Sequence, residues 1–119
     1  MKIVDNYESK IWLGLRVGYT DSYFNKADIA RVISEWCNEK KQCVTITPTE
    51  FIYVDGKEPG VIIGFINYAR FPQSEVEIRN RTRELATILM KKFKQYRVSC
   101  TFYPSHAGGS MMLENTKIK

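Results

Sequence analysis

The stretch VIIGFINYARFPQSEVEIRNRTRE (61–84) decides the fold class of this chain. Residues 61–69 are almost wholly apolar, which is typical of a central strand that is covered on both faces. Ser74 and Glu77 then stand three positions apart, as in a capping box, and predict a helix that begins at Ser74 and runs to about residue 95. A buried strand followed by a capped helix indicates an α+β domain.

Upstream of this stretch, the sequence predicts one more strand and one more helix. Residues 11–19, IWLGLRVGY, alternate between apolar and other residues, which is typical of a strand with one buried face. Trp12 and Arg16 fall on the second face of that strand, where two glycines either leave room for a close approach or simply mark bends. Residues 25–41 carry an apolar stripe at helical spacing, and Asn25 is suited to cap that helix.

Three further strands complete the pattern. Residues 43–54 are rich in β-branched and aromatic residues, but Pro48 interrupts them, so they form an edge strand, a bulged strand or two short strands. The turn-forming residues 55–60 connect this segment to the apolar run as a hairpin. Residues 97–103 alternate again, and residues 111–113 favour one short terminal strand.

The order of elements is therefore β-α-β-β-α-β plus a short C-terminal strand. We predict the split βαβ (ferredoxin-like) arrangement, an antiparallel sheet with two helices packed on one face. The length of 119 residues suits a single domain, with residues 1–9 and 114–119 frayed. One face of such a sheet stays uncovered, which favours a homo-oligomer, a dimer or higher.

Composition bounds the partners and the location. Eighteen Lys and Arg against thirteen Asp and Glu give a formal charge of +5, which favours anionic partners, although a modest charge also serves solubility alone. No apolar run is long enough to cross a bilayer and no secretory signal is visible, so we expect a cytoplasmic protein without membrane contact. Three cysteines without CxxC spacing favour free thiols, and no metal or cofactor is expected.

The sequence lacks the usual catalytic patterns. His106 is the one histidine, and neither a nucleophile elbow nor a phosphate-binding glycine loop accompanies it. We therefore expect a binding protein that is not an enzyme, and a small phosphoester-processing enzyme with His106 as its base stays an alternative. A nucleic-acid-binding module of the same fold is a second alternative, for which the strand at 61–69 offers Phe65 and Tyr68 but no basic residue between them.

The junction between strand 61–69 and the following helix is basic and aromatic. Tyr68, Arg70, Phe71 and Asn80 lie along it, and Arg97 begins a later strand. An aromatic ring stacks on a base, a guanidinium grips a phosphate, and an amide reads a base edge or a ribose hydroxyl. These side chains therefore suit a small anionic nucleotide, unless glutamates of the same helix merely neutralise the arginines.

The segments YARFPQSEVEIRN (68–80) and QYRVSCTFY (95–103) resemble elements of small phage proteins of the Thoeris anti-defence type. Those proteins are oligomeric nucleotide sponges, whose pockets between protomers are lined by an aromatic residue, an asparagine and arginines. The resemblance implies that Phe71, Asn80 and Arg97 bind a cyclic ADP-ribose isomer without cleaving it, with Arg16 or Lys57 as a further basic contact. It also implies inhibition of a bacterial immune pathway, in the host cytoplasm if a phage encodes the protein.

Overall fold

The computed structural model describes residues 1–105 and 108–115. Both predicted helices and all the predicted strands are present, in the predicted order. The elements in chain order are β1 (Glu8–Gly14), α1 (Lys26–Lys40), β2 (Thr45–Tyr53), β3 (Gly56–Ile66), α2 (Glu75–Lys92), β4 (Arg97–Tyr103) and β5 (Ser110–Glu114).

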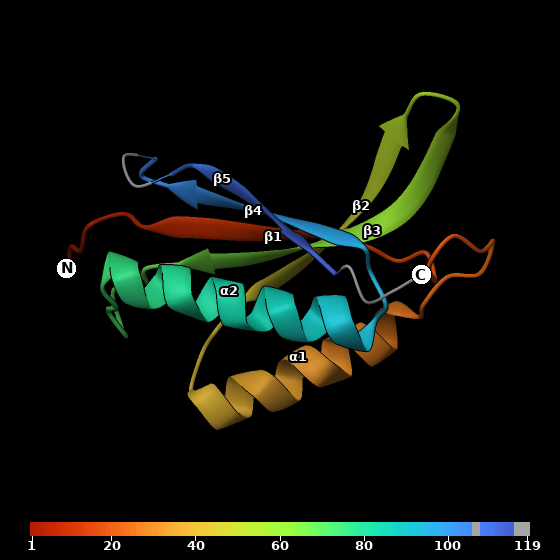
Figure 1. The fold of residues 1–119 in the computed structure, drawn as a ribbon. Coiled ribbons are helices and arrows are strands. Elements are labelled where there is room, and N and C mark those ends of the chain that lie inside the picture. The colour runs from red at the N-terminus through yellow and green to blue at the C-terminus, as the bar shows by residue number, and fades with distance from the viewer. Residues whose placement is uncertain (106–107, 116–119) are drawn as a thin grey trace.

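The five strands form one antiparallel sheet in the order β2-β3-β1-β4-β5. Both helices lie on the same side of this sheet, and the tip of the β2–β3 hairpin reaches away from them (Figure 1). The split βαβ prediction is therefore confirmed. Pro48 lies in β2, the strand at the edge of the sheet, where a missing backbone donor is tolerated.

Local signals explain where the helices begin. The side chain of Asn25 accepts a hydrogen bond of 2.9 Å from the backbone N–H of Ala27, and Ser74 accepts one of 3.1 Å from the N–H of Glu77. Each cap satisfies a backbone donor that has no partner inside the helix. Helix α2 ends at Lys92, three residues before the predicted end at residue 95.

The hydrophobic core lies between the helices and the sheet. Ile11 and Leu13 of β1, Phe65 of β3 and Leu85 of α2 are essentially inaccessible to water. A buried polar pair joins the same layers, because the hydroxyls of Ser9 and Thr82 lie 2.5 Å apart, and Thr82 also donates to the carbonyl of Ile78. The core therefore fixes β1 against α2, which sets the position of every residue on the other face of β1.

The structure corrects several details. Strand β1 begins at Glu8 and ends at Gly14, so residues 8–10 belong to it and residues 15–19 do not. Strand β3 is covered only on the helix side, and Phe65 turns into the core instead of onto the uncovered face. His106 and residues 116–119 lie outside the described residues. None of the helices in the described part of the chain is long and apolar enough to span a membrane.

Candidate functional site

The uncovered face of the sheet carries the candidate site. Because side chains alternate along a strand, the burial of Ile11 and Leu13 under the helices turns Lys10 and Trp12 to the opposite face. Trp12 pairs in register with Ser99 of β4 and Ile62 of β3, near the middle of the sheet. An indole at this position is flanked by strands on both sides and has no helix above it.

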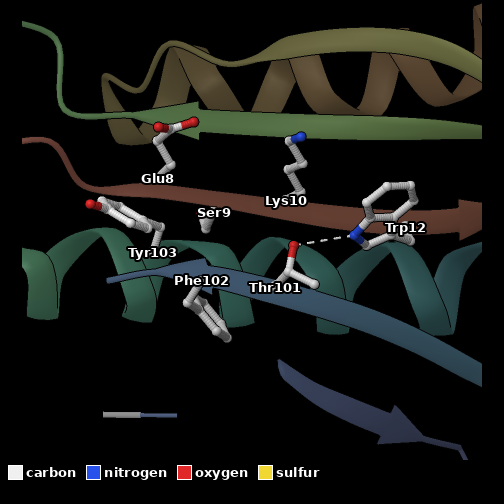
Figure 2. A pocket seen from close by; sticks show the side chains of 7 residues that line it. All are labelled: Glu8, Ser9, Lys10, Trp12, Thr101, Phe102 and Tyr103. Atoms are coloured by element: carbon white, nitrogen blue, oxygen red, sulfur yellow. Dashed lines mark hydrogen bonds between the residues drawn. The ribbon is translucent and has the colours of Figure 1, made fainter. Parts of the chain in front are cut away.

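A first hollow of about 290 Å³ lies beside Trp12 at the start of β1. Figure 2 shows Trp12 and Thr101 next to each other, where the indole Nε1 donates a hydrogen bond of 3.3 Å to the Thr101 hydroxyl. The Lys10 ammonium lies 5.9 Å from the centre of the Trp12 ring, a cation–π distance. Glu8, Phe102 and Tyr103 line the same hollow, so it combines a negative and a positive charge with aromatic residues.

A second hollow of about 190 Å³ lies on the other side of Trp12. Its wall includes the Phe51 ring, the Glu58 carboxylate and the Arg97 guanidinium. A methyl group on Gly14 would stand 2.8 Å from a carboxylate oxygen of Glu58, and one on Gly60 would collide with the Phe51 ring. The two glycines therefore make room for the carboxylate and the ring to lie flat over the sheet. We call the two hollows together the open-face groove.

The charges of the open-face groove remain available to a ligand. Arg97 Nε lies 3.9 Å from Glu114 Oε1, and the two side chains are 63% and 49% exposed, so solvent screens this pair and it contributes little. A guanidinium held this loosely can turn to an anionic group at modest cost. The arrangement suits a ligand with a flat ring, hydroxyl groups and its own charges, which is the chemistry of a nucleoside derivative.

Three of the residues predicted from the basic junction lie together, away from this groove. Tyr68 and Phe71 line a third cavity, of about 520 Å³, near the end of α1 and the beginning of α2. Arg70 stacks over the Phe71 ring at 5.1 Å, and Phe71 is 63% exposed. A hydrogen bond with Cys43, together with burial, raises the pKa of the Tyr68 hydroxyl.

The other three predicted residues lie elsewhere. Asn80 is exposed on α2, where its amide oxygen accepts a hydrogen bond of 3.0 Å from Arg83. Arg16 follows the end of β1, and its pKa is raised mainly by a hydrogen bond with Tyr23. Arg16 and Arg97 lie at the same end of the sheet, because the Gln95 amide that lines the second hollow donates to the Arg16 carbonyl at 2.7 Å.

One chain therefore does not gather the six predicted residues into one pocket. Tyr68 follows the end of β3 that pairs with Glu8, whereas Arg97 begins β4, two residues before Ser99, which pairs with Trp12 toward the opposite end of β1. The seven residues of β1 separate these ends by about 20 Å. Binding of a ligand by the predicted residues stays a prediction.

Sequence reasoning missed most of the open-face groove. Glu58 lies among glycine and proline residues that predict a turn. Nothing in the sequence indicates which residue the Phe51 ring packs against. The useful signal was the glycines on the outer face of the first strand. Their prediction of a close approach is confirmed at Gly14, which the Glu58 carboxylate covers.

No family model and no curated protein matches the chain. Two solved structures share its fold: a phage SAM lyase in complex with S-methyl-5′-thioadenosine (TM-score 0.74, 16% identity) and a phage SAM lyase in the apo state (TM-score 0.73, 17% identity). Each match covers 92% of this chain and 90% of the other. At this identity the likeness establishes the fold.

The comparison corrects one expectation from the sequence and supports another only in its coarser form. The prediction that the protein is not an enzyme is overturned, because both structures that share its fold are of an enzyme. The likeness also supports the expectation that this fold occurs among phage proteins. It does not support the nucleotide-sponge family in particular.

Proposed function

We propose that this protein binds S-adenosylmethionine (SAM) in the open-face groove and cleaves it as a lyase, releasing S-methyl-5′-thioadenosine. The observation that carries the proposal is Trp12, an uncovered indole with the carboxylate of Glu58 on one side and the ammonium of Lys10 on the other. A fold shared with a SAM lyase supports the reaction class.

The reaction constrains which groups belong near the sulfur. The C–S bond to the amino-acid chain breaks, its electron pair stays on sulfur, and the sulfonium becomes a neutral thioether. Because a lyase adds no water, the amino-acid fragment closes on its own carboxylate oxygen as a lactone. Positive charge is lost at sulfur, so a carboxylate set against the sulfonium would stabilise the substrate more than the transition state.

This argument assigns roles within the groove. Trp12 stacks on the adenine ring, a contact worth about 1–3 kcal/mol. Glu58 accepts hydrogen bonds from the ribose hydroxyls, away from the sulfur. Arg97 or Lys10 binds the substrate carboxylate as a charged donor. All four side chains line the two hollows that meet at Trp12.

A second copy of the chain completes this site under the proposal. The hollows of about 290 and 190 Å³ are each smaller than the roughly 300–1,000 Å³ of most ligand pockets. A homo-oligomer that places another protomer over the open face would enclose the substrate and exclude water from it. The expected dimer or larger assembly therefore remains part of the proposal.

The direct test incubates the purified protein with SAM and measures S-methyl-5′-thioadenosine by liquid chromatography and mass spectrometry. We expect this product to form. The Glu58→Gln variant should lower the rate of product formation by about ten-fold or more, as for the loss of a charged hydrogen-bond acceptor. The matched control is Glu50→Gln on the same hairpin, because Glu50 is exposed and lines neither hollow. Intact SAM after prolonged incubation with the wild-type protein would overturn the lyase proposal.

The ligand predicted from the sequence enters this test as a competitor. A cyclic ADP-ribose isomer and a single-stranded oligonucleotide are each added to the SAM reaction. We expect neither compound to slow the cleavage of SAM in the open-face groove. Tight binding of the cyclic nucleotide, with no turnover of SAM, would favour the sequence-based ligand over SAM.

A further inference from the structure

The cavity that Tyr68 and Phe71 line is not part of the open-face groove. It has a volume of about 520 Å³ and shares no lining residue with either hollow. It lies where the end of α1 and the loop from α1 to β2 meet the loop from β3 to α2 and the beginning of α2. We call it the helix-end cavity.

Two cations of the helix-end cavity have no carboxylate partner within ion-pair distance among the described residues. Lys41 caps α1 in a left-handed conformation, and Arg81 lies in the second turn of α2. Arg81 Nη1 is buried and finds no hydrogen-bond acceptor in the described part of the chain. A buried donor without an acceptor is costly, so the guanidinium gains if it turns toward an anion that enters the cavity.

The third nearby cation already has a partner. Lys40 Nζ lies 3.1 Å from Glu84 Oε1, on the side of α2 that faces α1. Glu84 does not line the helix-end cavity. Its pKa is lowered mainly by a hydrogen bond with Trp36 and also by the Arg81 guanidinium, so Glu84 offsets part of the Arg81 charge from outside the cavity. Lys41 and Arg81 remain lining cations without an ion pair among the described residues.

The lining of the helix-end cavity also includes two aromatic residues. Phe71 is largely exposed, and Tyr68 is partly buried beside it in the same cavity. A pair of amide hydrogen bonds, of 3.0 and 2.9 Å, ties Gln42 to Gln73 and joins the two loops that border the cavity. The rings are thus presented by a connected frame and not by two independent loops.

The Glu77 carboxylate also lines the cavity and opposes an anion near it. Gln73 Nε2 donates a hydrogen bond of 2.8 Å to Glu77 Oε1, which places the carboxylate next to the amide pair. Glu77 stands one helical turn before Arg81 on α2. A ligand that fits both residues carries a negative group for Arg81 and a donor, such as a hydroxyl or amino group, for Glu77.

We infer that the helix-end cavity binds a small aromatic phosphate, with its ring against Phe71 and its phosphate at Arg81 and Lys41. The inference does not depend on SAM cleavage, because the two sites share no residue. The recognition combines stacking with a charged fork, which together favour a ring joined to a phosphate over either part alone.

Calorimetric titration with adenosine monophosphate (AMP), adenosine and inorganic phosphate tests this inference. We expect AMP to bind more tightly than both of its parts. Arg81→Gln should weaken AMP binding about ten-fold or more. The matched control is Arg83→Gln on the same helix, because Arg83 is exposed and lies outside the cavity. Phe71→Ala, at an exposed position that the fold does not need, should weaken AMP and leave phosphate binding unchanged.

The inference would be overturned if AMP does not bind at millimolar concentration, or if the Arg81→Gln and Arg83→Gln variants bind AMP with equal affinity. Loss of AMP binding in the Trp12→Ala variant would also overturn it, because that result would place the ligand in the open-face groove. SAM cleavage is measured in parallel on Arg81→Gln, and it should stay at the wild-type rate. The failure of one proposal is thereby separated from the failure of the other.

Discussion

The helix-covered face and the open face of the sheet are built from the same strands and differ in every physical property. Along β1, Ile11 and Leu13 are fully buried, whereas Lys10 and Trp12 line a hollow that no helix covers. The covered face removes apolar area from water and so supplies stability. The open face keeps charges, rings and space, so a single strand of alternating residues serves packing on one side and ligand binding on the other.

The largest expected effect separates two neighbouring residues of β1. Ile11→Ala deletes buried methylene groups and leaves a cavity, so the free energy of unfolding should fall by about 3 kcal/mol. Lys10→Ala, on the open face, should change it by less than about 0.5 kcal/mol. Urea denaturation of both variants measures the contrast. Comparable losses would mean that the two faces do not divide packing from binding.

The elements that were predicted well are those with local causes. Asn25 and Ser74 cap their helices because each side chain bonds a backbone N–H two or three residues away. The alternation of residues 11–15 likewise gave the correct buried face of β1. Patterns of this kind need no knowledge of the rest of the chain.

The open-face groove depends on register, which local patterns do not contain. Glu58 covers Gly14 because β1 and β3 pair so that Gly14 faces Gly60. Neither partner indicates the other in the sequence. The basic junction shows the opposite error. Arg70 and Arg97 were grouped because of their charge, but they lie toward opposite ends of the sheet.

A smaller effect is expected in acid, and it belongs to the covered side. A hydrogen bond of 3.0 Å from Trp36 Nε1, followed by the ion pair with Lys40, lowers the pKa of Glu84 from its usual 4.5. A carboxyl whose pKa is lower in the folded state stabilises the fold above its unfolded pKa, and this contribution is lost as the pH falls from about 4.5 through the folded pKa. The side chain of Glu84 is 40% exposed, so the contribution should stay below about 1 kcal/mol.

The two tryptophans turn this acid effect into a matched experiment. Trp36→Phe removes the donor to Glu84, so the loss of stability between about pH 6 and about pH 3 should shrink. Trp12→Phe should leave that loss unchanged, because Trp12 donates to Thr101 and not to a carboxylate. Urea denaturation at both pH values gives the two differences, and an equal change in both variants would contradict the assignment to Glu84.

Tryptophan fluorescence during titration with S-methyl-5′-thioadenosine tests most directly whether the open face is the ligand site. Trp12 lines both hollows of the open-face groove, whereas Trp36 is a buried residue of α1. We predict that the ligand quenches the Trp36→Phe variant, which keeps Trp12, and leaves the Trp12→Phe variant unchanged. Quenching that survives in Trp12→Phe and disappears in Trp36→Phe would place the ligand on the helix side and contradict the account.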